Sequence, residues 1–115
     1  MSHDKAYLHD IIESFERAMG YLGTLTERDL AADQMTQDAI IRRIEIVGEA
    51  TKRLSDGMRN ANPQVPWREM AGMRDILIHG YDRVDVVRVH SVVTVRMPVV
   101  IDELKRIRDT LPDPE

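Results

Sequence analysis

Apolar residues recur at intervals of three and four along most of this chain, which is the spacing of one face of an α-helix. The pattern predicts a first helix that begins with Asp4 as its N-cap and ends near Gly23. A second long helix is predicted from a cap at Asp33 or Thr36 to the region of Leu54. The connector between them, "TLTERDLAADQMT", has residues suited to one short helical turn. The first half of the chain is therefore expected to form a pair of long helices.

Proline and glycine divide the second half of the chain. Pro63 and Pro66 bracket a loop, and Pro66 suits the first turn of a third helix, "WREMAGMRDILIH", which is predicted to end at His79. Gly80 is expected in the left-handed conformation just past that end. The valine-rich stretch that follows does not alternate as a strand would, and it keeps a helical spacing through Pro98. A fourth helix that is kinked or interrupted at Pro98, or two helices that meet there, is predicted.

The composition agrees with an all-α bundle of four to five helices in a single domain, residues 1–115. Hydrophobic residues make up 43% of the chain and charged residues 31%, which is too apolar for a disordered protein. The chain has no Cys, so disulfides and thiolate metal sites are excluded. The first ten residues are polar and no apolar run would span a bilayer, so a cytoplasmic protein without a membrane partner is expected.

Three residues have assignable packing roles. Gly48 lowers helix propensity by about 1 kcal/mol relative to Ala, so it is expected to let another helix approach the second long helix closely. Thr51 is the polar member of that helix's apolar stripe, and its hydroxyl is expected to bond to the preceding turn while its methyl group packs. Trp67 is expected to anchor packing rather than to stack on a base.

The net charge of −4 argues against a protein that binds nucleic acid through its overall field, and no DNA partner is expected. The arginines are concentrated in the middle of the chain. They form either a cationic cleft on an acidic body or a set of separate solvated helix faces, and the sequence leaves both arrangements open. Arg43 and Arg53 lie at helical spacings that suit salt bridges, and lining an RNA channel is the alternative role for them.

The stretch "RDILIHGYDR" combines a fixed cation, a group that titrates near neutrality and a phenol: Arg74, His79 and Tyr81. Cleavage of an RNA phosphodiester by its own 2′-hydroxyl needs a base, an acid and a cation that stabilises the phosphorane. Histidine and arginine supply that chemistry without a metal ion. The other histidines lie at no spacing typical of metal ligands, so neither a metal site nor any other cofactor is predicted.

The spacing of Arg74 and His79 raises a geometric difficulty, because residues five apart lie about 140° apart around a helix axis. The helix can unwind at Gly80 and release His79 and Tyr81 toward a common cleft. Alternatively, two chains pair about a twofold axis, so that Arg74 of one protomer meets His79 of the other, which is the better geometry. Asp75, four residues before His79, shares its face and can orient the imidazole. The simpler alternative is a histidine near a helix end, a surface arginine and a tyrosine at the core edge, without catalysis.

The motif "RDILIHGY" resembles the R-x4-H-x-Y motif of the HepT-like proteins, which belong to the HEPN superfamily of all-α ribonucleases. The segment "RRIEIVGEATKRLS" is similar to the second helix of that family, "PQVPWREMAGMRDILIHGY" to its central block and "MPVVIDEL" to its final helix. The resemblance covers nearly the whole chain in order. It implies a HEPN-like bundle that forms a homodimer with the motif at the interface cleft.

The resemblance also implies an activity and a partner. HepT-like proteins are metal-independent RNA endonucleases that act as toxins of toxin–antitoxin pairs, with tRNA among their substrates. Their partner is a minimal nucleotidyltransferase antitoxin that transfers AMP from ATP to the motif tyrosine. By position, Arg74 and His79 resemble the catalytic pair, and Asp75 fills the polar position after the arginine. Tyr81 resembles the AMP acceptor, where an adenylate would exclude the RNA phosphate.

The rival hypothesis keeps the fold and removes the catalysis. It describes an all-α dimer that is catalytically silent and binds a nucleotide or a nucleotidyltransferase through the same cleft. RNA cleavage by the purified protein separates the two hypotheses.

Overall fold

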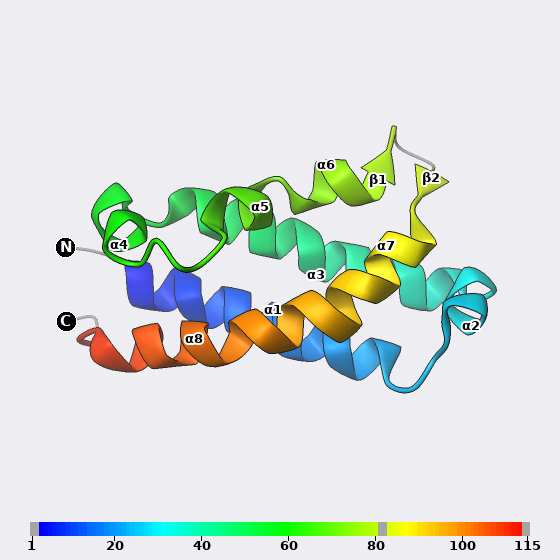
Figure 1. Ribbon diagram of the computed structural model, residues 1–115, viewed down its shortest axis with the longest axis horizontal. Coiled ribbons are helices and arrows are strands. Elements are labelled where there is room, and N and C mark those ends of the chain that lie inside the picture. Colours follow the sequence, from blue (N-terminus) through cyan, green and yellow to red (C-terminus); the bar gives the residue numbers. More distant parts are fainter. Residues whose placement is uncertain (1–2, 81–82, 114–115) are drawn as a thin grey trace.

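Two long antiparallel helices lie at the centre of the structure, a computed structural model that describes residues 3–80 and 83–113 (Figure 1). These helices are α1 (Asp4–Leu22) and α3 (Gln34–Arg53), joined through the short α2 (Glu27–Ala31). The last helical rod runs back along α1 and consists of α7 (Val86–Ser91), the π-helical turn η1 (Val92–Arg96) and α8 (Met97–Thr110). The predicted all-α fold is confirmed. No helix in the described part of the chain has the length and apolar character needed to cross a membrane.

The helix starts follow the predicted capping chemistry with one exception. Thr26 Oγ1 accepts a hydrogen bond from the Asp29 N–H (3.1 Å) while the Asp29 carboxylate accepts one from the Thr26 N–H (3.0 Å), which forms a capping box at α2. Asp33 caps α3. Asp4, predicted to cap α1, is instead its first helical residue. Its buried carboxylate accepts hydrogen bonds from the Ser55 N–H (2.8 Å) and hydroxyl (2.6 Å), so it joins the start of α1 to the end of α3.

The segment between α3 and the last rod is more divided than its sequence pattern predicts. It contains α4 (Asp56–Ala61), α5 (Trp67–Ala71), α6 (Met73–Leu77), β1 (Ile78–His79) and β2 (Arg83–Val84). The helix α4 precedes the loop between Pro63 and Pro66, in a stretch for which the sequence pattern predicts no helix, and Ser55 caps it. The predicted third helix is broken at Gly72 and ends before His79. The expectation of one helix that ends at the histidine is therefore wrong.

The helix ends early because its last carbonyl has a partner from further along the chain. The Leu77 carbonyl accepts a hydrogen bond from the Asp85 N–H (2.8 Å), and β1 pairs with β2 in antiparallel register. Gly80 has φ 70°, the predicted left-handed value, but it follows a strand rather than a helix. His79 is thus held on a short hairpin.

The predicted disturbance near Pro98 takes the form of the π-helical turn. Proline has no N–H to donate, and its ring clashes with the carbonyl four residues earlier. The Met97 N–H donates to the Val92 carbonyl, a bond across five residues, and this wider turn precedes Pro98. The rod therefore continues through the proline instead of splitting into two helices.

The core explains the packing residues on α3. A Cβ atom placed on Gly48 would lie 3.2 Å from the Ala71 carbonyl oxygen, so glycine lets α5 pass directly over α3, as predicted. The buried Thr51 hydroxyl donates to a carbonyl of the preceding turn (2.6 Å), which confirms its predicted bond. Trp67 is buried, and its indole N–H donates to the Asn62 carbonyl (2.9 Å), which confirms a packing role.

Candidate functional site

Arg74 lies on α6, where its side chain reaches the middle of α3. Its Nε donates to Glu45 Oε2 (3.3 Å), and its Nη1 lies 3.8 Å from Asp75 Oδ1. The Arg74 side chain remains 44% exposed. Exposed ion pairs of this kind contribute about 0–1 kcal/mol, so an RNA phosphate can compete with the carboxylates for the guanidinium. Glu45 therefore orients Arg74 without sequestering it.

His79 lies at the outer end of β1 and is exposed. Within the described residues, its side chain makes no hydrogen bond or ion pair. The preceding residue, Ile78, is buried in the core, as the alternation of a strand requires. The imidazole is therefore exposed to solvent, with no partner among the described residues.

Asp75 does not take the position that its sequence spacing predicts. Because α6 ends at Leu77, Asp75 and His79 do not lie one helical turn apart, and the face they were expected to share does not form. The Asp75 side chain is 87% exposed and pairs with Arg74 instead. Tyr81, the fourth predicted site residue, lies outside the described residues.

The structure does not show the first of the two predicted ways to join Arg74 and His79, namely unwinding of the helix at Gly80. The chain leaves the helix at Ile78 rather than at Gly80, so His79 departs from the α6 surface. Among residues 3–80 and 83–113, no hydrogen bond or ion pair joins Arg74 to His79. The two side chains belong to adjacent elements, and neither bonds to the other.

Arg74 borders a hollow of about 350 Å3 between α3 and α6. Its lining consists of Arg42, Glu45, Gly48, Glu49, Lys52, Ala71, Arg74 and Asp75. A second hollow of about 280 Å3 adjoins it, because three of its lining residues, Arg42, Glu45 and Glu49, are shared with the first. Arg53 lines this second hollow. The two hollows thus lie side by side over the same stretch of α3, the first toward α6 and the second toward α1.

Arg42 and Arg53 line these hollows, whereas Arg43 and Arg53 are the candidates for an RNA channel on the basis of the sequence. Arg43 lines neither hollow, whereas Arg42 lines both. Neither Arg42 nor Arg53 forms an ion pair with any other residue that the structure describes. The two lie eleven residues apart, and eleven residues make about three helical turns, so they share a face of α3. The sequence alone could have identified Arg42, because it lies about three full helical turns before Arg53.

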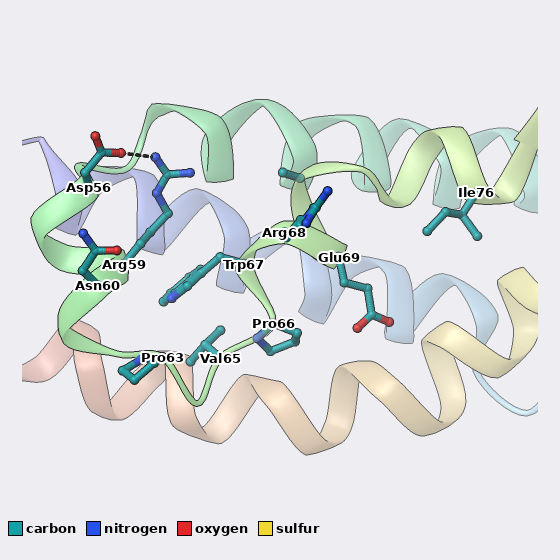
Figure 2. Close-up of a pocket in the computed structure, with 11 residues that line it drawn as sticks. Asp56, Arg59, Asn60, Pro63, Val65, Pro66, Trp67, Arg68, Glu69 and Ile76 are labelled. Atoms are coloured by element: carbon teal, nitrogen blue, oxygen red, sulfur yellow. Dashed lines mark hydrogen bonds and ion pairs between the residues drawn. The ribbon is translucent and has the colours of Figure 1, made fainter.

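A larger groove of about 1000 Å3 lies elsewhere (Figure 2). It is lined by parts of α4, α5 and the intervening loop, with Ile76 of α6 at one end and Arg59, bonded to Asp56 (2.6 Å), near the other. Ile76 and Arg74 are two residues apart on α6, about 200° around its axis. Since neither Arg74 nor His79 lines this groove, it is separate from the candidate site.

The described histidines outside the motif have no metal-binding arrangement. Among residues 3–80 and 83–113, no three His, Asp or Glu side chains lie together as a metal site would require. His90 Nε2 lies 2.9 Å from the Leu25 carbonyl oxygen, so His90 has a structural contact with the connection between α1 and α2.

Comparison with known proteins identifies the family. The model of the family described as "Ribonuclease HepT-like" matches residues 11–107. A protein of Thermococcus cleftensis named "Probable ribonuclease HepT" is 38% identical over 104 residues, which cover 90% of this chain and 94% of that protein. A protein of Methanocaldococcus jannaschii named "Gamma-glutamylcyclotransferase and putative RNase" is 42% identical over 93% of this chain and 48% of its own length. No solved structure matches the chain. The helical fold and these matches together show that the chain belongs to the HepT-like ribonuclease family.

Proposed function

We propose that this protein is a metal-independent endoribonuclease, with His79 as general acid and base and Arg74 as the cation that stabilises the transition state. The observation that supports the proposal most directly is the exposed, unengaged imidazole on the hairpin that follows the Arg74 helix. Membership of a ribonuclease family supports an RNA substrate, and tRNA is the first candidate to test.

The proposed reaction uses the RNA as its own nucleophile. His79 accepts the proton of a ribose 2′-hydroxyl as the 2′-oxygen forms a bond to the adjacent phosphorus. The bond from phosphorus to the 5′-oxygen of the next nucleotide breaks, and that oxygen receives a proton from an imidazolium. The products are a 2′,3′-cyclic phosphate and a 5′-hydroxyl. Arg74 offers parallel N–H donors to the phosphorane oxygens, which carry the developing charge.

We propose that the substrate strand crosses α3 through the two hollows, from the α6 side to the α1 side. Arg42 and Arg53 contact its phosphates there, and Arg42 takes the role that the sequence pattern assigned to Arg43. Glu45 and Glu49 lie on the same path, so phosphate contacts are confined to the arginines that lack a carboxylate partner. This arrangement is compatible with a protein whose net charge is −4.

The proposed enzyme is a homodimer with a composite site, because Arg74 faces α3 while His79 lies on the hairpin. A cation from one protomer can meet the imidazole of the other across a twofold axis. Regulation is proposed to act through Tyr81: a minimal nucleotidyltransferase antitoxin transfers AMP from ATP to its hydroxyl and releases pyrophosphate. The adenylate adds negative charge and bulk beside His79, which excludes the RNA phosphate. The protein is then the toxin of a toxin–antitoxin pair.

The test is RNA cleavage in EDTA by the native protein and by His79→Ala and Arg74→Ala. Each substitution is expected to lower cleavage by about 100-fold or more, since positioned acid–base groups contribute at least that much. Arg106→Ala on α8 is the control for loss of an exposed arginine. Cleavage by both site variants at the native rate would contradict the assignment. No cleavage by the native protein would favour a catalytically silent module that binds a nucleotide or a nucleotidyltransferase.

The same two variants test the composite site. If each site combines Arg74 of one protomer with His79 of the other, a 1:1 mixture of inactive variants regains about a quarter of the native activity. Half of the dimers are then mixed, and each mixed dimer has one intact site of two. If both residues act within one chain, the mixture remains inactive.

The regulatory step is tested by intact mass. Incubation with the nucleotidyltransferase and ATP is expected to add the mass of AMP to the native protein and to abolish cleavage. Tyr81→Phe should remain active, unmodified and insensitive to that treatment. Modification of Tyr81→Phe to the same extent would place the acceptor elsewhere.

A further inference from the structure

We propose that Arg83 is a second phosphate-binding residue of the His79 site, an inference that rests on the proposed ribonuclease function. In the β1–β2 hairpin, His79 pairs directly with Arg83, and Ile78 pairs with Val84. Directly opposed residues of an antiparallel pair project to the same side, with Cβ atoms about 4.5–5.5 Å apart. The backbone register therefore starts the side chains of His79 and Arg83 from the same side of the hairpin within one chain.

The hairpin has an inner and an outer face, and this pair occupies the outer one. Ile78 is buried and Val84 packs against the core, while His79 and Arg83 are exposed. The hydrogen bond from the Asp85 N–H to the Leu77 carbonyl (2.8 Å) closes the base of the hairpin. The inner contacts thus fix the side from which His79 and Arg83 reach the solvent.

Arg83 differs from Arg74 in its charge environment. Arg74 has a carboxylate at 3.3 Å and another at 3.8 Å, from Glu45 and Asp75. Arg83 forms no ion pair with any residue in the described ranges. The acid closest to it along the described chain, Asp85, accepts from the Arg88 N–H (3.1 Å) and pairs with the Arg88 guanidinium (3.4 Å). Among the described residues, Arg83 thus has no carboxylate partner of its own.

A phosphodiester of single-stranded RNA suits this pair of side chains. The guanidinium fork of Arg83 can donate two hydrogen bonds to the non-bridging oxygens of one phosphate, and the imidazole beside it then faces the adjacent ribose. Contacts to phosphate fix the position of the strand and carry no base preference. Arg83 acts in this way as a substrate-binding residue on a phosphate next to the one that Arg74 stabilises.

RNA binding tests the contact without cleavage. The probe is a fluorescently labelled oligouridylate, and the His79→Ala background prevents turnover. Loss of one phosphate contact on single-stranded nucleic acid reduces the slope of log affinity against log salt by about 0.7. Arg83→Ala is expected to show that reduction, and Arg83→Lys is expected to retain most of the slope. Arg106→Ala makes the same change in net charge on α8 and should leave the slope unchanged.

Cleavage kinetics supply the second readout. A phosphate contact made equally in the ground state and the transition state raises KM and leaves kcat unchanged when it is lost. Arg83→Ala in the native background should therefore raise KM several-fold, whereas Arg74→Ala lowers kcat. Circular dichroism checks that the exposed substitution leaves the helical fold intact.

The outcomes separate this inference from the proposed function. Native cleavage together with an unchanged salt slope and KM in Arg83→Ala would overturn the Arg83 contact and leave the ribonuclease intact. A reduced slope in Arg83→Ala from a protein that does not cleave RNA would support the phosphate contact and overturn the ribonuclease. A native protein that neither binds nor cleaves RNA would overturn both.

Discussion

At the residue scale, Gly48 determines how closely the segment that carries Arg74 lies against α3. The atom nearest to a Cβ placed at this glycine is a backbone oxygen, that of Ala71, at 3.2 Å. A backbone atom cannot rotate away as a side chain can, so a methyl group must push α5 outward. The contact of Arg74 with Glu45, one turn before Gly48 on α3, would then lengthen. The absence of a side chain at position 48 thus influences both the stability of the fold and the contact of Arg74 with Glu45.

Gly48→Ala is expected to lower the free energy of unfolding by about 1 kcal/mol. Overpacking costs about 1–3 kcal/mol and outweighs the gain in helix propensity of about 1 kcal/mol. Gly20→Ala on α1 is the matched control, because no atom lies within 4 Å of its Cβ position. It should raise the free energy of unfolding by about 0.5–1 kcal/mol. Urea denaturation measures both changes, and shifts in the same direction would contradict the packing argument.

The sequence identifies some residues of the site and misses or misplaces others. Arg74 and His79 are identified by residue type, because few side chains supply a fixed cation and a group that titrates near neutrality. Arg83 is not identified, since its place beside His79 depends on a hairpin register that its neighbours in the sequence do not encode. Asp75 is misplaced because the helix that would have brought it to His79 ends at Leu77.

At the element scale, prediction succeeds where a helix is long. The apolar period of α1 and α3 continues for 19 and 20 residues, so it identifies both helices and their buried faces. The stretch around α5 and α6 has the same period, but Gly72 breaks it and the Leu77 carbonyl bonds to the Asp85 N–H. The spacing of apolar residues cannot reveal a hydrogen bond between two backbone groups on either side of a turn. Short elements held by such bonds are therefore the ones that sequence patterns mistake.

The loop before α5 is attached to α8 by a carboxylate with a strongly shifted pKa. Hydrogen bonds from Arg106 and Gln64 lower the pKa of Glu103 from 4.5 to about 2. The Gln64 amide donates to Glu103 Oε1 (2.6 Å), which links the loop to the helix. A lowered pKa in the folded state means that the contact stabilises the protein above pH 4.5 and that this stabilisation disappears as the pH falls toward about 2.

Glu103→Gln is therefore expected to change how the stability of the protein falls at acidic pH. Native protein should lose stability between pH 4.5 and about 2 more steeply than the variant, because the glutamine cannot titrate. Denaturation midpoints in urea across that range measure the difference. Parallel curves for the two proteins would show that the loop contact does not contribute to acid stability.

At the scale of the whole molecule, the elements differ in how many of their described cations have a carboxylate partner, and α3 carries both paired Lys52 and unpaired arginines. Every Lys and Arg of α1, α7, η1 and α8 that the structure describes has a carboxylate partner, as in Lys105 with Glu16 and Arg96 with Glu69. The arginines without one, among the described residues, lie on α2, α3, α5 and β2: Arg28, Arg42, Arg43, Arg53, Arg68 and Arg83. The described arginines without a carboxylate partner are thus spread over four elements, and only Arg42 and Arg53 line a common hollow.

The salt dependence of RNA binding follows from this distribution. If Arg42, Arg53, Arg74 and Arg83 each contact one phosphate of a single strand, the slope of log affinity against log salt is expected to be about −3, at about 0.7 per contact. The adjacent residues Arg42 and Arg43 provide the sharpest comparison, because only Arg42 lines the hollows along α3. Arg42→Ala should reduce the slope by about 0.7, and Arg43→Ala should leave it unchanged. Fluorescence anisotropy from low to moderate salt measures both slopes, and equal losses from the two variants would mean that the strand does not follow this face of α3.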